Sequence, residues 1–72
     1  MTSKDSEKVN TIKQLLQTVK GDDPDAFLMG YIRYINSIQN RNDKLEVYNA
    51  VKAKFGSKFN EKEWKYMMRL DN

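Results

Sequence analysis

Apolar residues recur with the period of an α-helix in four blocks of the chain, and short polar stretches separate the blocks. The blocks cover residues 3–20, 25–40, 44–55 and 61–70. None of them alternates apolar and polar positions as a half-buried strand would. The pattern predicts an all-α fold, a compact bundle of about four short helices that forms a single domain over residues 1–72.

The second block is the most apolar stretch of a very polar chain, and we expect it to form the central helix. Its apolar arc is wider than the stripe that an ordinary surface helix buries, so it should need partners on two sides. The side of the arc that is expected to be core consists of Leu28, Ile32 and Ile35. The broader, more aromatic side, which the other helices need not cover completely, consists of Phe27, Tyr31, Tyr34 and Ile38.

The junction between the first two blocks carries a stop signal and a start signal. Gly21 is expected to end the first helix in a left-handed conformation, after a basic Lys20 in the last turn. Asp23 is expected to cap the second helix, with Pro24 at its first position. The three close carboxylates of residues 22, 23 and 25 could instead bind a divalent cation, but their spacing does not match the calcium-loop pattern. Capping is therefore favoured, and no metal site is predicted.

The third helix is expected to begin after a polar joint that follows the second. Asp43 is the predicted N-cap, with Glu46 three residues later as its reciprocal acceptor. Gly56 is the predicted stop at its C-terminal end.

The fourth helix has the clearest start signal in the chain. Asn60 is the predicted N-cap, and Glu63 would complete a capping box with it. Phe59 before the cap and Trp64 at the fourth helical position would form a hydrophobic staple.

The composition argues against several classes of function but does not identify the function. The 72 residues include no histidine and no cysteine, so the commonest general base, the strongest nucleophile and any disulfide are absent. The glycines are isolated and form no phosphate-binding loop. We therefore expect no enzyme, no cofactor and no small-molecule substrate, although an active site based on lysine or tyrosine stays open. The polar beginning of the sequence and the lack of a long apolar run predict a cytoplasmic protein with no membrane partner.

One possible binding surface is a basic face near the end of the chain. Projected as a helix, Lys62, Lys65 and Arg69 fall within an arc of about 60°, on the side away from Trp64. A helix, a short turn with glycine and a second helix with a basic outer face outline a helix-turn-helix-like unit in residues 45–70. The further cations that would contact the nucleic acid backbone are Lys52, Lys54 and Lys58. Any amphipathic helix has a charged outer face, so a simple solvated face is the commoner explanation.

A second possible surface consists of apolar and aromatic residues that a small core need not cover. Tyr31, Tyr34 and Tyr66 lie at or near the edges of their apolar arcs, and Met29 falls outside the main arc. Tyrosine and methionine at a half-exposed edge are typical of protein–protein interfaces. Gly30, next to Tyr34 on the same helix, would let another backbone approach closely.

These features support two hypotheses of different classes. The leading one is a non-catalytic protein-binding module (an inhibitor, adaptor or regulatory protein) whose partner is another protein or a second copy of itself. The alternative is a small DNA-binding regulator. The small size, the richness in lysine and asparagine and the four short helices are similar in style to small proteins of low-GC bacteria and their phages, which fits a phage or mobile-element origin.

Overall fold

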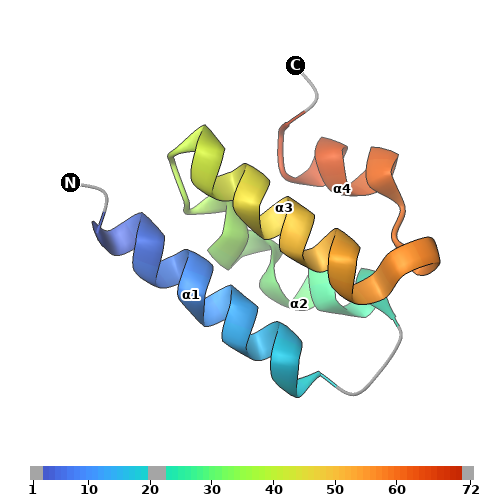
Figure 1. The fold of residues 1–72 in the computed structure, drawn as a ribbon. Helices are drawn as coiled ribbons and strands as arrows, with labels where there is room; N and C mark the ends of the chain where they lie inside the picture. The colour runs from blue at the N-terminus through green and yellow to red at the C-terminus, as the bar shows by residue number, and fades with distance from the viewer. Residues whose placement is uncertain (1–2, 20–22, 71–72) are drawn as a thin grey trace.

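The computed structural model describes residues 3–19 and 23–70, which form four α-helices and one short 3-10 helix (Figure 1). This architecture confirms the predicted all-helical, compact arrangement of four helices. The elements, in chain order, are α1 (Ser3–Thr18), α2 (Pro24–Asn36), α3 (Arg41–Phe55), the 3-10 helix η1 (Gly56–Lys58) and α4 (Glu61–Met67).

The central helix is α3, so the prediction that the second helix is central is wrong. Figure 1 shows α1 beside α3, α2 behind it and α4 on its other side, and α3 packs against all three. The prediction relied on apolar content, whereas the central helix is the one that packs against the other three helices. Besides its buried apolar side, α3 has polar residues that form ion pairs with its neighbours. Glu46 pairs with Lys13 of α1, and Lys52 pairs with Glu61 of α4.

The core draws on every helix and on the connections between them. Both predicted sides of the second block contribute to it, since Leu28 and Ile35 are buried from one side, and Phe27 and, beyond the end of α2, Ile38 are buried from the other. Tyr31, Ile32 and Tyr34 pack against this core while staying half-exposed. The remaining buried hydrophobic residues are Val9, Ile12, Leu16, Val47, Tyr48, Val51, Phe55, Phe59, Trp64, Met68 and Leu70.

The second helix is shorter than the block that predicted it, because the chain leaves the helix after Asn36. Ile38 then enters the core from an irregular connection. Two polar contacts from α1 hold this connection. Lys8 Nζ donates to the carbonyl oxygen of Ser37 at 3.3 Å, and the carboxylate of Asp5 accepts from the N–H of Asn40 at 3.2 Å.

The predicted N-cap of α2 is confirmed. The Asp23 carboxylate accepts from the N–H groups of Asp25 and Ala26 at 3.1 and 3.2 Å, and Pro24 occupies the first helical position. The residues that were expected to end α1, Lys20 and Gly21, lie outside the described residues, as does residue 22.

The predicted N-cap of α3 is wrong. The cap is Asn40, whose side-chain oxygen accepts from the N–H of Asp43 at 3.1 Å, so the helix starts at Arg41 and Asp43 lies in its first turn. Asn40 and Asp43 are both good capping residues, and the choice depends on where the chain leaves α2. At the other end the predicted glycine stop is confirmed: Gly56 follows the helix with a φ of 60°.

The start of α4 is confirmed in two of its three predicted parts. The Asn60 side chain accepts from the N–H of Glu63 at 3.1 Å, and the rings of Phe59 and Trp64 are in contact with centroids 5.3 Å apart. The third part is wrong, because within the described chain the Glu63 carboxyl makes no hydrogen bond to the Asn60 N–H and lies instead beside the carboxyl of Asp25 in α2. A second helix placed beside the first turn of α4 supplies a competing partner for this side chain.

The end of α4 is a Schellman motif with an unusual residue in its left-handed position. Arg69 has a φ of 60°, and its N–H donates to the carbonyl of Tyr66 at 3.1 Å. The N–H of Leu70 donates to the carbonyl of Lys65 at 2.8 Å, which completes the pattern. The helix therefore ends at Met67, and Leu70 turns back into the core.

Three side chains from elsewhere in the chain hold the carbonyl groups at this end of α4. Asn36 Nδ2 donates to the carbonyl of Met67 at 2.9 Å, Lys44 Nζ to that of Met68 at 3.3 Å, and Arg41 Nη2 to that of Leu70 at 3.0 Å. A helix end leaves such carbonyls without helical partners, and two of the three donors are cations that complement its negative dipole. The end of α4 is thus fixed to α2 and to the first turn of α3.

Candidate functional site

The half-buried tyrosines of α2 face α1 across an apolar groove. Tyr31 and Tyr34 form one wall, and Thr11 and Leu15 of α1 form the other. The groove encloses about 290 Å³, and almost all of its surface is apolar. The ring of Tyr31 is tilted against the buried ring of Phe27 with centroids 4.8 Å apart, so this wall of the groove is in contact with the core.

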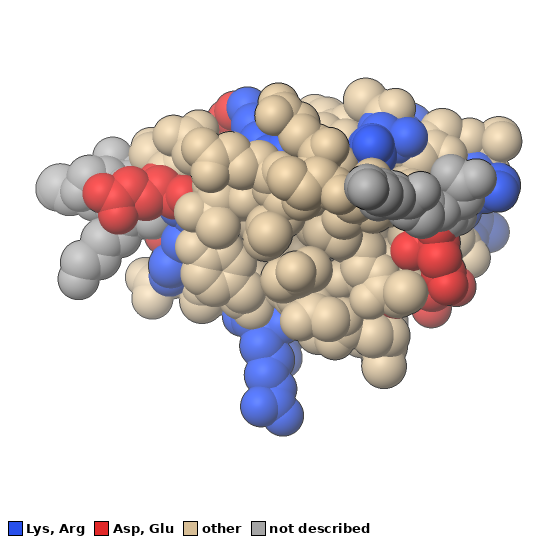
Figure 2. Space-filling view, turned by 90° about the horizontal axis from the view of Figure 1, so that it is seen from below, with Lys and Arg blue, Asp and Glu red and all other residues tan. Residues whose placement is uncertain are grey.

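The groove lies between the two helices that border the underside of the molecule in Figure 1. Figure 2 looks onto this underside and shows that residues without charge cover most of its centre, while acidic side chains lie toward its two ends. A surface with little charge at its centre and charged residues around it has the composition of a protein-binding interface.

Sequence reasoning identified one wall of the groove and missed the other. Thr11 and Leu15 are four residues apart on one flank of α1, and that spacing is visible in the sequence. Which flank of α1 meets α2 depends on how the two helices pack, and the spacing alone carries no such information.

The four predicted contact residues do not form one patch. Tyr31 and Tyr34 are brought together in the groove, whereas Met29 and Tyr66 are not among the residues that line it. Met29 is 72% exposed on α2 and Tyr66 is 70% exposed on α4. These two are the large apolar side chains that stand out most from the surface of the described residues.

The outward side of α2 has a composition of its own. Ala26, Met29, Gly30 and Arg33 are all exposed, and their spacing of three and four residues places them on one face of the helix. A Cβ atom at Gly30 would meet nothing within 4 Å. We call these four residues the outer face of α2; of them, only Met29 and Gly30 were singled out from the sequence.

Two carboxyl groups meet beside this face. Asp25 in the first turn of α2 and Glu63 in the first turn of α4 place their carboxyl groups close enough to interact. The hydrogen bond to Asp25 and the charge of Asp25 raise the pKa of Glu63, because the protonated form can donate to the neighbouring carboxylate. The ion pairs that join described residues, Lys13–Glu46 and Lys52–Glu61, include neither of these acids.

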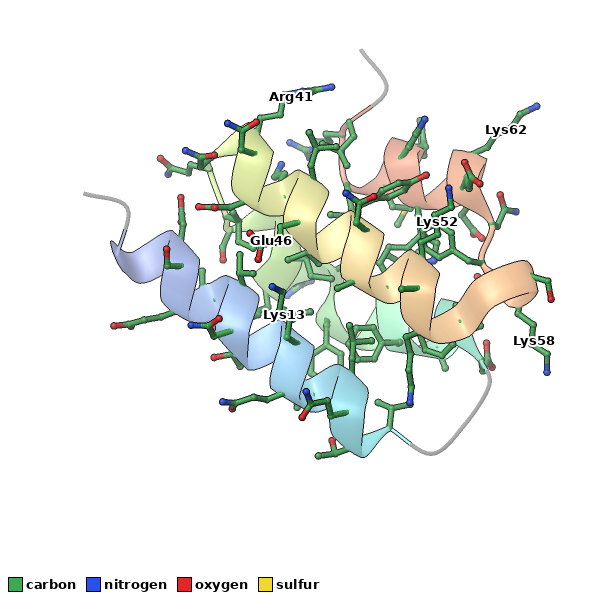
Figure 3. The ribbon with its side chains drawn as sticks, viewed as in Figure 1. Lys13, Arg41, Glu46, Lys52, Lys58 and Lys62 are labelled. Atoms are coloured by element: carbon green, nitrogen blue, oxygen red, sulfur yellow. The ribbon has the colours of Figure 1, made fainter. Side chains whose placement is uncertain are left out.

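Part of the predicted basic face is engaged within the chain. Lys52 Nζ lies 3.1 Å from Glu61 Oε2, and this contact lowers the pKa of Glu61. The Tyr48 hydroxyl donates to the same carboxylate at 3.4 Å, and Lys65 Nζ lies 5.9 Å from the centre of the Tyr48 ring. Burial and the nearby Glu61 raise the pKa of Tyr48. Figure 3 shows Lys52 directed from α3 toward α4.

The other predicted cations are spread over the surface. Lys54 lines a second groove of about 340 Å³ between α1 and α3. Lys58 on η1 and Lys62 on α4 point in different directions (Figure 3). Arg69 follows the end of α4, so it does not share a helical face with Lys62 and Lys65 as the projection predicted. The helix that would enter a DNA groove, α4, has only seven residues.

The described residues also bear on metal binding and on membrane insertion. Within residues 3–19 and 23–70 no group of three or more histidine, cysteine, aspartate or glutamate side chains is arranged to hold a metal ion. In the same ranges no helix combines the length and the apolar character that crossing a bilayer requires.

No protein-family model, curated protein or solved structure matches this chain.

Proposed function

We propose that this chain is a non-catalytic protein-binding module, such as a small inhibitor, adaptor or regulatory protein, that binds another polypeptide through the groove between α1 and α2. The observation that carries the proposal is the apolar groove between Tyr31 and Tyr34 of α2 and the flank of α1, in a face with little charge at its centre. Tyrosine is suited to such a site because its ring gains from burial while its hydroxyl keeps a polar partner or water.

The size of the groove favours a polypeptide over a small molecule. At about 290 Å³ it lies at the lower limit of pockets that hold small ligands, which are roughly 300–1,000 Å³. A groove of this size accommodates an apolar side chain that projects from a partner, while the surrounding uncharged surface contributes the rest of the contact area.

A non-catalytic role is supported by the surroundings of the titratable groups. The shifted pKa values of Tyr48, Glu61 and Glu63 arise from burial, an ion pair and a carboxyl contact, and none of the three side chains lines the groove. A perturbed group inside a cleft would be the usual sign of a catalytic site.

Site-specific photo-crosslinking in the native host tests this function. A photo-reactive phenylalanine analogue would replace Tyr34, and in a matched control it would replace Lys62, which is exposed on α4. We expect the variant at position 34 to yield a protease-sensitive adduct with another polypeptide, and the control to yield much less. Equal or absent crosslinking at both positions would overturn the proposal.

The same experiment addresses the DNA-binding alternative. A nuclease-sensitive adduct at position 62, together with none at position 34, would favour a nucleic-acid partner over a protein. Binding of the chain to duplex DNA that falls steeply as salt rises would support the same conclusion, because released counterions dominate such binding.

A further inference from the structure

The outer face of α2 is exposed without any internal reason for its composition. Gly30 lies inside the helix and has no neighbour that a side chain would strike. Glycine at such a position weakens a helix relative to alanine, and within the described chain nothing is gained in return. Beside it, Met29 leaves 72% of its surface in solvent. An approaching helix would both use the space above Gly30 and cover Met29.

The charges on this side of α2 have no opposite partner within the described chain. Arg33 is exposed, and no carboxylate of residues 3–19 or 23–70 forms an ion pair with it. Asp25, eight positions earlier on the same helix, faces another carboxyl group, that of Glu63. One end of the helix therefore presents a cation and the other end presents acids.

We propose that the outer face of α2 is the seam of a homodimer in which a second copy of the chain lays its own α2 antiparallel across Gly30. Arg33 and Asp25 each lie four residues from Met29, which is about 6 Å along the axis at 1.5 Å per residue. A two-fold axis near Met29 then places Arg33 of each copy opposite Asp25 of the other, so one symmetric contact forms two ion pairs.

Self-association is favoured over a foreign helix because the charges complement themselves. A foreign partner would have to carry an acid and a cation at matching positions, whereas a second copy carries both by identity. The seam uses one helix of thirteen residues from each copy, so the dimer belongs to the class of small, weak interfaces. The inference concerns a different set of residues from the groove and does not depend on what the groove binds.

Sedimentation velocity of the whole chain tests the dimer, from about 10 µM to about 1 mM, a range that covers weak association. We expect the wild type to shift from one to two chains per particle with rising concentration. Gly30→Gln places a side chain in the seam but in open space in the monomer, so it should weaken association by about tenfold or more while the helix melts no earlier. A control variant, Lys62→Asp, removes a cation elsewhere and should associate like the wild type.

A charge exchange between copies identifies the partner residues. Arg33→Asp alone and Asp25→Arg alone should each weaken association by about tenfold, because each places like charges opposite one another. An equimolar mixture of the two variants should associate again, since every contact in the mixed dimer joins Asp to Arg. Circular dichroism of each variant confirms that it is folded before it is mixed.

Three outcomes overturn the inference. One is a wild type that remains a single chain at every concentration. Another is a dimer that Gly30→Gln leaves intact, which would place the contact elsewhere. The third is a mixture of the two charge variants that associates no better than either variant alone.

Discussion

Two regions of this molecule differ in whether their charged residues have partners of opposite charge or other binding groups within the chain. Where α3 meets α4, cations are engaged within the chain: Lys52 pairs with Glu61, Lys65 lies over the Tyr48 ring, and Lys44 binds a carbonyl of the last turn. On the outward side of α2, Arg33 has no acid to pair with among the described residues, and Asp25 meets a second acid. The first region is complete by itself, whereas the second presents charges that another molecule could neutralise.

The apolar residues of the two regions differ in the same sense. Phe59 contacts both Tyr48 and Trp64, with ring centroids 5.1 and 5.3 Å apart, and all three are buried. On α2, Met29 and the surface beside Gly30 are open. The difference suggests that α3 and α4 supply stability while α2 supplies the surface for binding, and four predictions would break or sharpen this division.

Trp64→Ala should have the largest effect. Trp64 is fully buried between α4 and the core, and replacing a buried tryptophan by alanine costs about 3–5 kcal/mol of unfolding free energy. In so small a domain that is a large share of the total stability. The control is Tyr66→Ala on the same helix, which should change stability by less than about 0.5 kcal/mol because Tyr66 is mostly exposed. Urea titration followed by circular dichroism measures both; similar losses would refute the assigned difference in burial.

A pair of glycine substitutions should act in opposite directions on the two regions. Gly56 after α3 has φ 60° and ψ −126°, so Gly56→Ala should cost about 1–3 kcal/mol through backbone strain alone. Gly30→Ala should stabilise the dilute, monomeric chain by about 0.5–1 kcal/mol, because the helix interior favours alanine. Thermal melts at low concentration give both values, and a destabilised Gly30→Ala variant would mean that the glycine has a role inside the monomer.

Loss of the cap of α3 should have an intermediate effect. Asn40→Ala removes the acceptor for the N–H of Asp43 and should cost about 1 kcal/mol, within the range of about 0.5–2 kcal/mol seen for N-caps. Asp43→Ala is the matched comparison, since Asp43 was the cap expected from the sequence and should cost less. The reverse ranking in chemical denaturation would restore Asp43 as the cap.

Glu63→Gln should have the smallest effect, and the effect depends on pH. The pKa of Glu63 is raised above its ordinary value of 4.5, so the folded state binds its proton more tightly than the unfolded chain does. That contribution is complete below the ordinary value and disappears as pH rises through the raised pKa. The glutamine variant should therefore melt slightly higher than wild type at neutral pH and equally at acidic pH. An equal difference at all pH values would show that the carboxyl contact is absent.

Local signals in the sequence predict the start of a helix well where neighbouring residues agree on one N-cap. Phe59 and Trp64 flank Asn60 as a hydrophobic staple, so the start of α4 could be predicted directly from the sequence. Asn40 and Asp43 are both good capping residues and lie three positions apart, so the sequence alone does not choose between them, and the structure has Asn40 as the cap.

Features that depend on two segments far apart in the chain could not be predicted in the same way. The groove needs the flank of α1 that carries Leu15 to face the tyrosines of α2. The carboxyl contact needs Asp25 and Glu63 to lie side by side, although 38 positions separate them. The left-handed Arg69 was unexpected for another reason, since glycine is the usual residue at that position.

The end of α4 is fixed by hydrogen bonds from Asn36, Arg41 and Lys44, and this has a consequence for its dynamics. A helix of seven residues does not persist alone in water, so α4 stays formed only while it is docked. Its amide protons should accordingly exchange together, with a lower opening free energy than those of α3. Since the only tryptophan of the chain is on α4, we expect its fluorescence to change whenever this helix detaches.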